Sequence, residues 1–166
     1  MQTLPETAPM TRGLASPVGP LVLEARNGAL CALRWGHVKH QSEAGAASGE
    51  DALLDEAARQ IEAYFAGQLT RFDLPLHLPE GDLLQAVLRQ MLDIPHGETR
   101  TYGEVARAVG SAPQPVGQAC GANPLPILVP CHRILSAKGL GGYSGGGGLE
   151  TKIALLKLEN GYPFLL

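Results

Sequence analysis

The chain has 166 residues, 45% of them hydrophobic, and a net charge of −3 at neutral pH. This length favours one domain, or one domain with a small second one, and the composition excludes a disordered chain. The charge excludes a uniformly basic nucleic-acid-binding protein. Residues 81–166 nevertheless carry seven basic and six acidic groups, so a site for a polyanion is expected in that half.

The start of the chain and its cysteines predict a cytoplasmic protein. Met1–Thr11 lacks the basic start and apolar block of a signal peptide, and no apolar run approaches the roughly 20 residues that span a membrane. The three cysteines form no disulfide pattern, so we expect a reducing compartment. A metal is not expected, because Cys31 with His37 and His40 lacks a fourth ligand at good spacing.

Residues 1–80 predict a small α/β domain. Asn27-Gly28 joins the apolar runs Leu21–Arg26 and Ala29–Trp35, and this dipeptide favours a hairpin because both turn residues need a positive φ. Apolar residues at helical spacing predict a helix at Asp51–Phe65.

The rest of this half has one more predicted strand. Alternation at Phe72–Leu78 predicts it, and Pro75 favours an edge position or a bulge. Met1–Ala15 is expected to be frayed, and Val38–Glu50 is expected to be a loop.

Residues 81–166 predict a mostly helical domain that contains a pair resembling a helix-turn-helix. Asp82 is a candidate N-cap, Thr101 and Glu104 fit a capping box, and Pro115 is suited to a first helical position. The predicted helices are Asp82–Leu92, Tyr102–Val109, Pro115–Cys120 and Leu149–Asn160, with Leu149, Ile153 and Leu156 on one face of the last.

Cys131 is a candidate nucleophile because it precedes His132 and Arg133, and a neighbouring cation or imidazole favours the thiolate. The alternative is a small buried side chain without a chemical role. Seven of the ten residues at Gly139–Gly148 are glycine. Such a segment either approaches a ligand closely and donates backbone N–H groups to an anion, or is a flexible surface loop.

An acidic group usually orders a cysteine–histidine dyad, and adjacent residues do not face each other in regular structure. Cys131 and His132 therefore need a turn or a bridging water between them. Lys152 and Glu159 are two turns apart on the last predicted helix and share one face. They are either part of this site or an exposed charged stripe.

The run NPLPILVPCHR at Asn123–Arg133 resembles the active-site signature of the O6-alkylguanine-DNA alkyltransferases, also called methylated-DNA–protein-cysteine methyltransferases. The similarity continues at Ile94–Ala106, Gly142–Gly146 and Lys152–Glu159, and it is strong over Gly81–Gly161. It implies a ribonuclease-H-like α/β domain, with a small antiparallel sheet and a helix, followed by a mostly α, winged helix-turn-helix-like domain.

The resemblance implies that Cys131 irreversibly takes the alkyl group from O6 of guanine in DNA, so that the protein is consumed by its reaction. A relay of Glu159, His132 and a water accepts the thiol proton. Tyr102 acts at the leaving oxygen and at the DNA backbone, and Asn123 orders the turns near the site. No cofactor is implied. The implied substrate-binding residues are Pro126, Tyr143, Ser144, Lys152 and Ile134.

The implied partner is double-stranded DNA containing O6-alkylguanine. The second helix of the pair enters the minor groove, and the damaged nucleotide is flipped out of the stack. The protein is expected to be a monomer that can cluster on DNA, with no membrane contact. The implied DNA-binding residues are Tyr102, Gln114, Val116, Gly117, Ala119, Gly121 and Arg133.

The chain departs from the family pattern at three places. Gln114 stands where an arginine usually fills the stack left by the flipped base, which predicts weaker DNA binding or slower flipping. The Gly145–Gly148 run is about two residues longer than usual, so the substrate loop is expected to be looser. Leu84 and Leu88 replace a usual aromatic pair, as a core substitution.

Two other functions compete with alkyl transfer. Alkyltransferase-like proteins hold damaged guanine without transferring the group, although they lack the cysteine nucleophile that Cys131 would be. A cysteine hydrolase using Cys131 and His132 would show turnover, and the sequence context Asn123–Arg133 argues against it.

Overall fold

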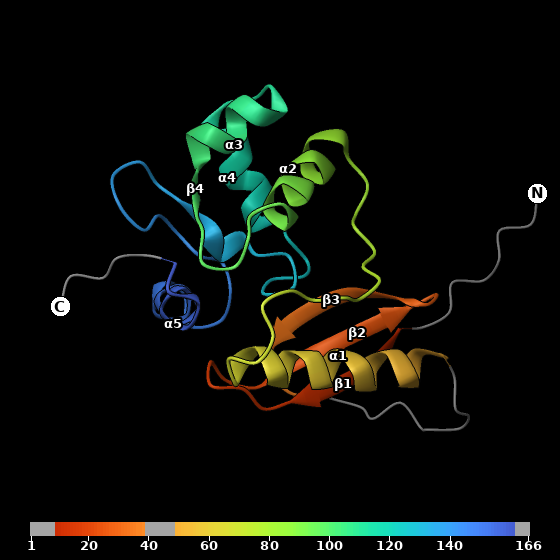
Figure 1. Ribbon diagram of the computed structural model, residues 1–166. Helices are drawn as coiled ribbons and strands as arrows, with labels where there is room; N and C mark the ends of the chain where they lie inside the picture. Colours follow the sequence, from red (N-terminus) through yellow and green to blue (C-terminus); the bar gives the residue numbers. More distant parts are fainter. Residues whose placement is uncertain (1–8, 39–48, 162–166) are drawn as a thin grey trace, which may run out of the picture.

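The computed structural model describes residues 9–38 and 49–161. The N-terminal part is a three-stranded antiparallel sheet in the order β1-β2-β3, formed by β1 (Met10–Leu14), β2 (Leu21–Arg26) and β3 (Ala29–Trp35). Helix α1 (Gly49–Phe65) runs across this sheet (Figure 1). Its buried residues include Leu54, Ile61 and Tyr64, which recur at helical spacing.

The predicted hairpin is confirmed, whereas two other predictions for this part are wrong. Asn27 and Gly28 both have positive φ, as the tight turn between β2 and β3 requires. Met10–Leu14 is not frayed but forms β1, which pairs with β2. Phe72–Leu78 makes only an isolated bridge, in which Leu30 bonds to Pro75 and His77, because proline cannot donate to a ladder.

The C-terminal part is mostly helical. Thr101 and Glu104 form the predicted capping box of α3, which ends at left-handed Gly110. Two short strands, β4 and β5, pair in parallel and bring residue 100 beside residue 134. The helices are α2 (Asp82–Leu92), α3 (Tyr102–Val109), α4 (Pro113–Gly121) and α5 (Leu149–Glu159), with β4 at Arg100–Thr101, the 3₁₀ turn η1 at Cys131–Arg133 and β5 at Ile134–Leu135.

Three details of these helices differ from expectation. Gly81 rather than Asp82 is the N-cap of α2, and Asp82 lies in its first turn. Helix α4 begins two residues early because Pro113, not Pro115, takes the first helical position. Leu149 is 45% exposed, since α5 buries Leu155 and Leu156 together with polar side chains.

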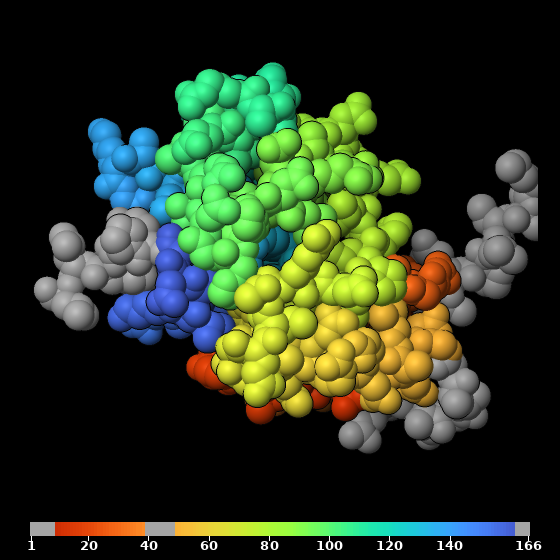
Figure 2. Space-filling view, in the orientation of Figure 1, coloured from red at the N-terminus to blue at the C-terminus, as the bar shows by residue number. Residues whose placement is uncertain are grey.

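One hydrophobic core runs through both parts, from Leu21 on β2 to Leu155 on α5. The segment that follows α1 crosses between the sheet and the helices, and the two parts pack against each other along it (Figure 2). A backbone hydrogen bond from Leu33 to Pro124 crosses the same boundary. Within the described residues, no helix is long and apolar enough to cross a membrane. The positions 39–48, which hold most of the predicted loop and His40, lie outside the described residues.

Candidate active site

Asn123 holds the chain that delivers Cys131. Its amide nitrogen donates to the Val129 carbonyl at 2.9 Å, and its amide oxygen accepts from the Leu125 N–H at 2.9 Å. Between them Ile127 has a φ of 73°, a conformation that β-branched residues rarely adopt and that persists only where neighbours fix it. The turn then ends in the 3₁₀ helix that carries Cys131, whose side chain is 6% exposed.

Cys131 lies at the wall of a cavity of about 260 Å³. Helices α3 and α4 form one side of the cavity, and the glycine-rich segment after β5 forms the other. The lining residues are Tyr102, Gly117, Cys120, Gly121, Cys131, Gly142, Tyr143 and Ser144.

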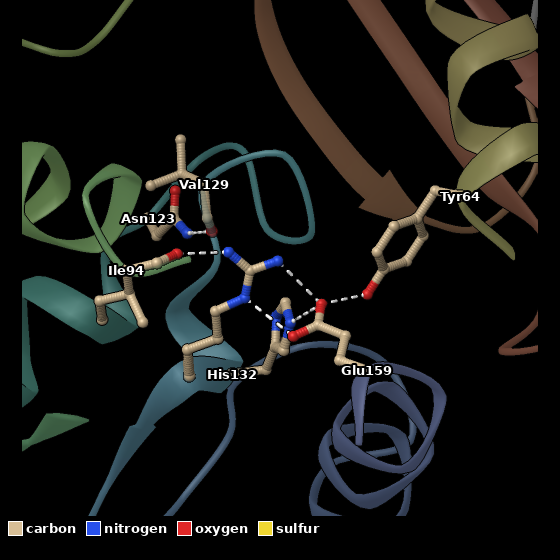
Figure 3. A network of polar contacts seen from close by, with 7 residues as sticks. Tyr64, Ile94, Asn123, Val129, His132 and Glu159 are labelled. Carbon is tan, nitrogen blue, oxygen red and sulfur yellow. Dashed lines mark hydrogen bonds and ion pairs between the residues drawn. The ribbon is translucent and has the colours of Figure 1, made fainter. Parts of the chain in front are cut away.

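Behind the cavity, the Glu159 carboxylate is the centre of a buried polar network (Figure 3). Its Oε2 lies 2.8 Å from His132 Nε2 and accepts from Arg133 Nη2 at 3.0 Å. Arg133 Nε donates to Oε1 at 2.8 Å, and Arg133 Nη1 donates to the Ile94 carbonyl at 2.6 Å. The Tyr64 hydroxyl, which reaches in from α1, donates to Oε2 at 2.5 Å.

This network fixes the proton on His132. Burial raises the pKa of Glu159, but hydrogen bonds from His132 and Arg133 outweigh it and hold that pKa well below its usual range. Burial lowers the pKa of His132 more than the hydrogen bond and the charge of Glu159 raise it, which favours the neutral imidazole. A neutral imidazole that donates through Nε2 to a carboxylate keeps Nδ1 as an acceptor. His132 Nδ1 is buried and has no hydrogen-bond partner among residues 9–38 and 49–161.

Opposing effects act on the Cys131 thiol. Burial raises its pKa, whereas a hydrogen bond from Asn123, the charge of Lys152 and backbone N–H groups all lower it. The Lys152 ammonium is itself buried and donates to the carbonyls of Ile134 and Gly142 at 2.7 and 3.0 Å. Burial lowers the pKa of Lys152 to about 8. Burial outweighs these effects and the pKa of Cys131 is raised, so the thiol is protonated at rest, while Asn123 and Lys152 offset part of the cost of forming its anion.

The glycine-rich segment is seated on Trp35 of β3. A Cβ on Gly146 would lie 2.4 Å from Trp35 Cγ, and one on Gly145 would lie 2.8 Å from the Trp35 ring, so neither position has room for a side chain. The Trp35 ring also meets Tyr143 edge-on, with 6.2 Å between centroids. Gly141, at φ 72°, passes close to the Tyr102 ring. The segment is therefore a fitted wall of the cavity and not a free surface loop.

The structure brings together most of the residues singled out in the sequence, but it does not place all of them at the cavity. Arg133 was expected to bind DNA, and this is corrected because its guanidinium points inward to Glu159. Val116 is fully buried, so its side chain cannot contact DNA, and Ala119 is 7% exposed. Pro126 and Ile134 are buried outside the lining, whereas Gln114 is exposed in the first turn of α4.

Three residues of this site were not predicted from the sequence. Tyr64 and Trp35 come from the N-terminal part, and no local pattern connects them to a cysteine far along the chain. Cys120 lines the cavity beside Cys131. Burial raises the pKa of Cys120 to about 12, which disfavours its thiolate.

Two sequence profiles match the chain. The 6-O-methylguanine DNA methyltransferase DNA binding domain matches residues 82–161, and the ribonuclease-like domain of the same protein matches residues 11–78. The chain belongs to the 6-O-methylguanine DNA methyltransferase family. The two matched regions correspond to the helical part and to the part with the small antiparallel sheet, so the fold class predicted from the sequence is confirmed.

Relatives of known name span nearly the whole chain. A methylated-DNA–protein-cysteine methyltransferase of Mycobacterium bovis is 43% identical over 151 residues, which are 89% of this chain and 90% of the relative. One from Methanosarcina acetivorans is 44% identical over 149 residues, covering 87% and 94%. The crystal structure of Mycobacterium tuberculosis OGT in complex with DNA superposes with a TM-score of 0.76 at 43% identity, covering 91% of this chain and 92% of that one.

Proposed function

We propose that this methyltransferase repairs DNA by direct reversal, and that Cys131 is the residue that accepts the O6-alkyl group of guanine. The observation that carries the proposal is the contact of His132 Nε2 with the Glu159 carboxylate, which leaves Nδ1 as an acceptor next in the chain to a cysteine that lines a cavity. A buried acceptor without a partner, on an imidazole whose other nitrogen meets a carboxylate, is suited to take a proton from the thiol.

The reaction is a single displacement. The Cys131 thiol gives its proton through a water to His132 Nδ1, and Glu159 stabilises the imidazolium that forms. The thiolate then attacks the methyl carbon, a C–S bond forms, and the bond from carbon to O6 breaks with its electron pair left on guanine. Protonation of guanine restores the normal base. The thioether on Cys131 has no route back, so each molecule acts once.

Charge develops on the guanine oxygen as the C–O bond breaks, and a donor near that atom accelerates the reaction. Tyr102 supports this role because its hydroxyl-bearing ring lines the cavity, and burial raises its pKa so that the proton is retained. Backbone N–H groups at Tyr143 and Ser144 are further candidates, and the Tyr143 ring would wall the base.

We propose that α4 approaches the minor groove of double-stranded DNA and that the alkylated guanine is flipped into the cavity. Gly117 and Gly121 on α4 have open space where a Cβ would stand, which permits close approach of the helix to the groove. The exposure of Gln114 in the first turn of α4 supports the proposal that this side chain enters the vacated stack. It adds no positive charge, so we expect modest affinity.

The remaining features of the proposal concern organisation. We propose that residues 1–80 and 81–166 are two domains, in keeping with two separate profile matches. We propose a monomer that can cluster on DNA, with no cofactor in the reaction. Its three unpaired cysteines fit the reducing cytoplasm.

The test uses duplex DNA with one O6-methylguanine and mass spectrometry of the protein. Trypsin releases residues 108–133 as one peptide that holds both Cys120 and Cys131, so fragment-ion sequencing is needed to place the methyl group. We expect one methyl group per molecule, on Cys131. Cys131→Ser should abolish the transfer, whereas Cys120→Ser, which removes the other thiol of the cavity, should retain it.

Two results would contradict the proposal. A methyl group found on Cys120 would move the nucleophile to the neighbouring thiol. Unmodified protein that still retards the damaged duplex in a gel would show a lesion-binding protein that transfers nothing.

A further inference from the structure

The Tyr64 hydroxyl makes a contact with the relay that the alkyl-transfer mechanism does not use. Tyr64 is on α1 of the N-terminal part and lies 95 residues from Glu159 in the sequence. It donates to Glu159 Oε2, the same oxygen that meets His132 Nε2. The hydroxyl therefore competes with the imidazole for one carboxylate oxygen (Figure 3).

The ring of Tyr64 and its hydroxyl have separable roles. The ring is 1% exposed and packs against Phe65 and Phe72, with centroids 5.1 and 5.3 Å away. A phenylalanine would fill this space equally well. Only the hydroxyl requires tyrosine, and a buried hydroxyl needs a partner, which Glu159 supplies.

We propose that Tyr64 is a positioning residue for alkyl transfer, and that its hydroxyl limits how strongly Glu159 holds a proton on His132. This inference rests on the proposed function of Cys131 and His132. Each donor that a carboxylate oxygen accepts withdraws charge from its other hydrogen bonds. With Tyr64 in place, Oε2 divides its charge among Tyr64, His132 and Arg133.

The sign of the effect follows from this division. Removal of the Tyr64 hydroxyl leaves more negative charge facing His132, which favours the imidazolium and raises the pKa of His132. A protonated His132 cannot accept the thiol proton, so transfer should then require a higher pH. The other titratable or charged groups that face this cluster are Arg133, Lys152, Cys131, Tyr143 and His96.

None of these other groups replaces the hydroxyl. Arg133 already donates to both carboxylate oxygens, and Lys152 is engaged by two carbonyls. His96 meets the Tyr64 ring edge-on, with 6.2 Å between centroids, and makes no hydrogen bond to Glu159 within the described residues. The Tyr64 hydroxyl is thus the donor whose loss changes the charge on Oε2 without removing a charged group.

The experiment compares Tyr64→Phe with Phe72→Leu in the full chain. Phe72→Leu disturbs the packing around the same ring and leaves the hydroxyl in place. The pKa of His132 is measured by nitrogen-15 NMR titration of the free protein, with its signals assigned by their loss in His132→Gln. Single-turnover rates on O6-methylguanine duplex are measured over the same pH range.

We expect Tyr64→Phe to raise the pKa of His132 by on the order of half a pH unit and to move the acid limb of the rate profile upward by the same amount. The rate ratio between variant and wild type should be lowest at acid pH, and Phe72→Leu should shift neither curve. An unchanged titration, or a rate lowered equally at every pH, would overturn the proposal. A wild-type protein that transfers no methyl group would refute the proposed function instead. The two failures can be told apart because the titration of His132 is made on the free protein, without DNA.

Discussion

Glu159→Gln removes the negative charge that faces the buried Arg133 guanidinium and the His132 imidazole. Glutamine keeps the shape of the side chain, but its amide nitrogen cannot accept the bonds that Arg133 and Tyr64 donate. Loss of one partner from a buried pair costs about 3–5 kcal/mol, because the other charge stays buried without compensation. For a chain of this length, that corresponds to roughly 10 °C in melting temperature.

This loss should depend on pH in a defined direction. The folded-state pKa of Glu159 is depressed below its ordinary value of 4.5. Its contribution to stability is therefore fully present above pH 4.5 and is lost as the pH falls, since the unfolded chain then takes up a proton that the folded chain does not. The gap between wild type and Glu159→Gln should be widest near pH 7 and should narrow below pH 4.5.

Urea denaturation at several pH values, followed by circular dichroism, measures this gap. Glu150→Gln is the matched control, because Glu150 is exposed in the first turn of the same helix and its loss should cost no more than about 0.5–1 kcal/mol. A Glu159→Gln protein within about 1 kcal/mol of wild type at pH 7 would refute the view that this carboxylate compensates a buried charge.

Three further substitutions test other parts of the structure. Gln114→Arg should tighten binding to undamaged duplex, measured by fluorescence anisotropy. The slope of the logarithm of the binding constant against the logarithm of the salt concentration should steepen by about one, and an unchanged slope would mean that residue 114 meets no phosphate. Gly146→Ala should lower the free energy of unfolding by about 1–3 kcal/mol, since a Cβ there meets Trp35, whereas Gly139→Ala, which meets nothing, should be nearly neutral. Equal losses at the two positions would argue against a fitted loop. Lys152→Met should move alkylation of the active-site thiol by iodoacetamide to higher pH, because the ammonium lowers that thiol's pKa; an unmoved profile would remove the lysine from the site.

Features determined by local sequence were predicted well. The hairpin at Asn27-Gly28 and the capping box at Thr101 were predicted from a few adjacent residues, and both are present. Strand β1 was missed because Met10–Leu14 shows no alternation and is a strand only through its pairing with β2. Alternation at Phe72–Leu78 does place apolar residues inward, yet a proline and the lack of a neighbouring ladder leave only a bridge.

For the site, the sequence indicated which residues take part, but not always where their side chains point. Motif similarity indicated Cys131, His132 and Glu159, and the last two are in contact. The inward turn of Arg133 depends on the position of Glu159 on a different element, which no spacing rule gives. The positions of Tyr64 and Trp35 at the site result from the packing of the sheet and α1 against the helices, which the sequence pattern alone does not give.

The close packing of the glycine-rich segment on Trp35 limits which substitutions this chain can accept during evolution. Because Gly146 leaves no space above the indole, a larger residue at this position needs a smaller one at position 35, and the reverse exchange opens a void. Positions 35 and 146 should therefore covary among close homologues, whereas a Cβ on Gly145 would also meet Tyr143 Cε1 at 2.4 Å. A change at position 35 of β3 would then alter the glycine-rich wall of the cavity, although β3 lies in the other part of the chain.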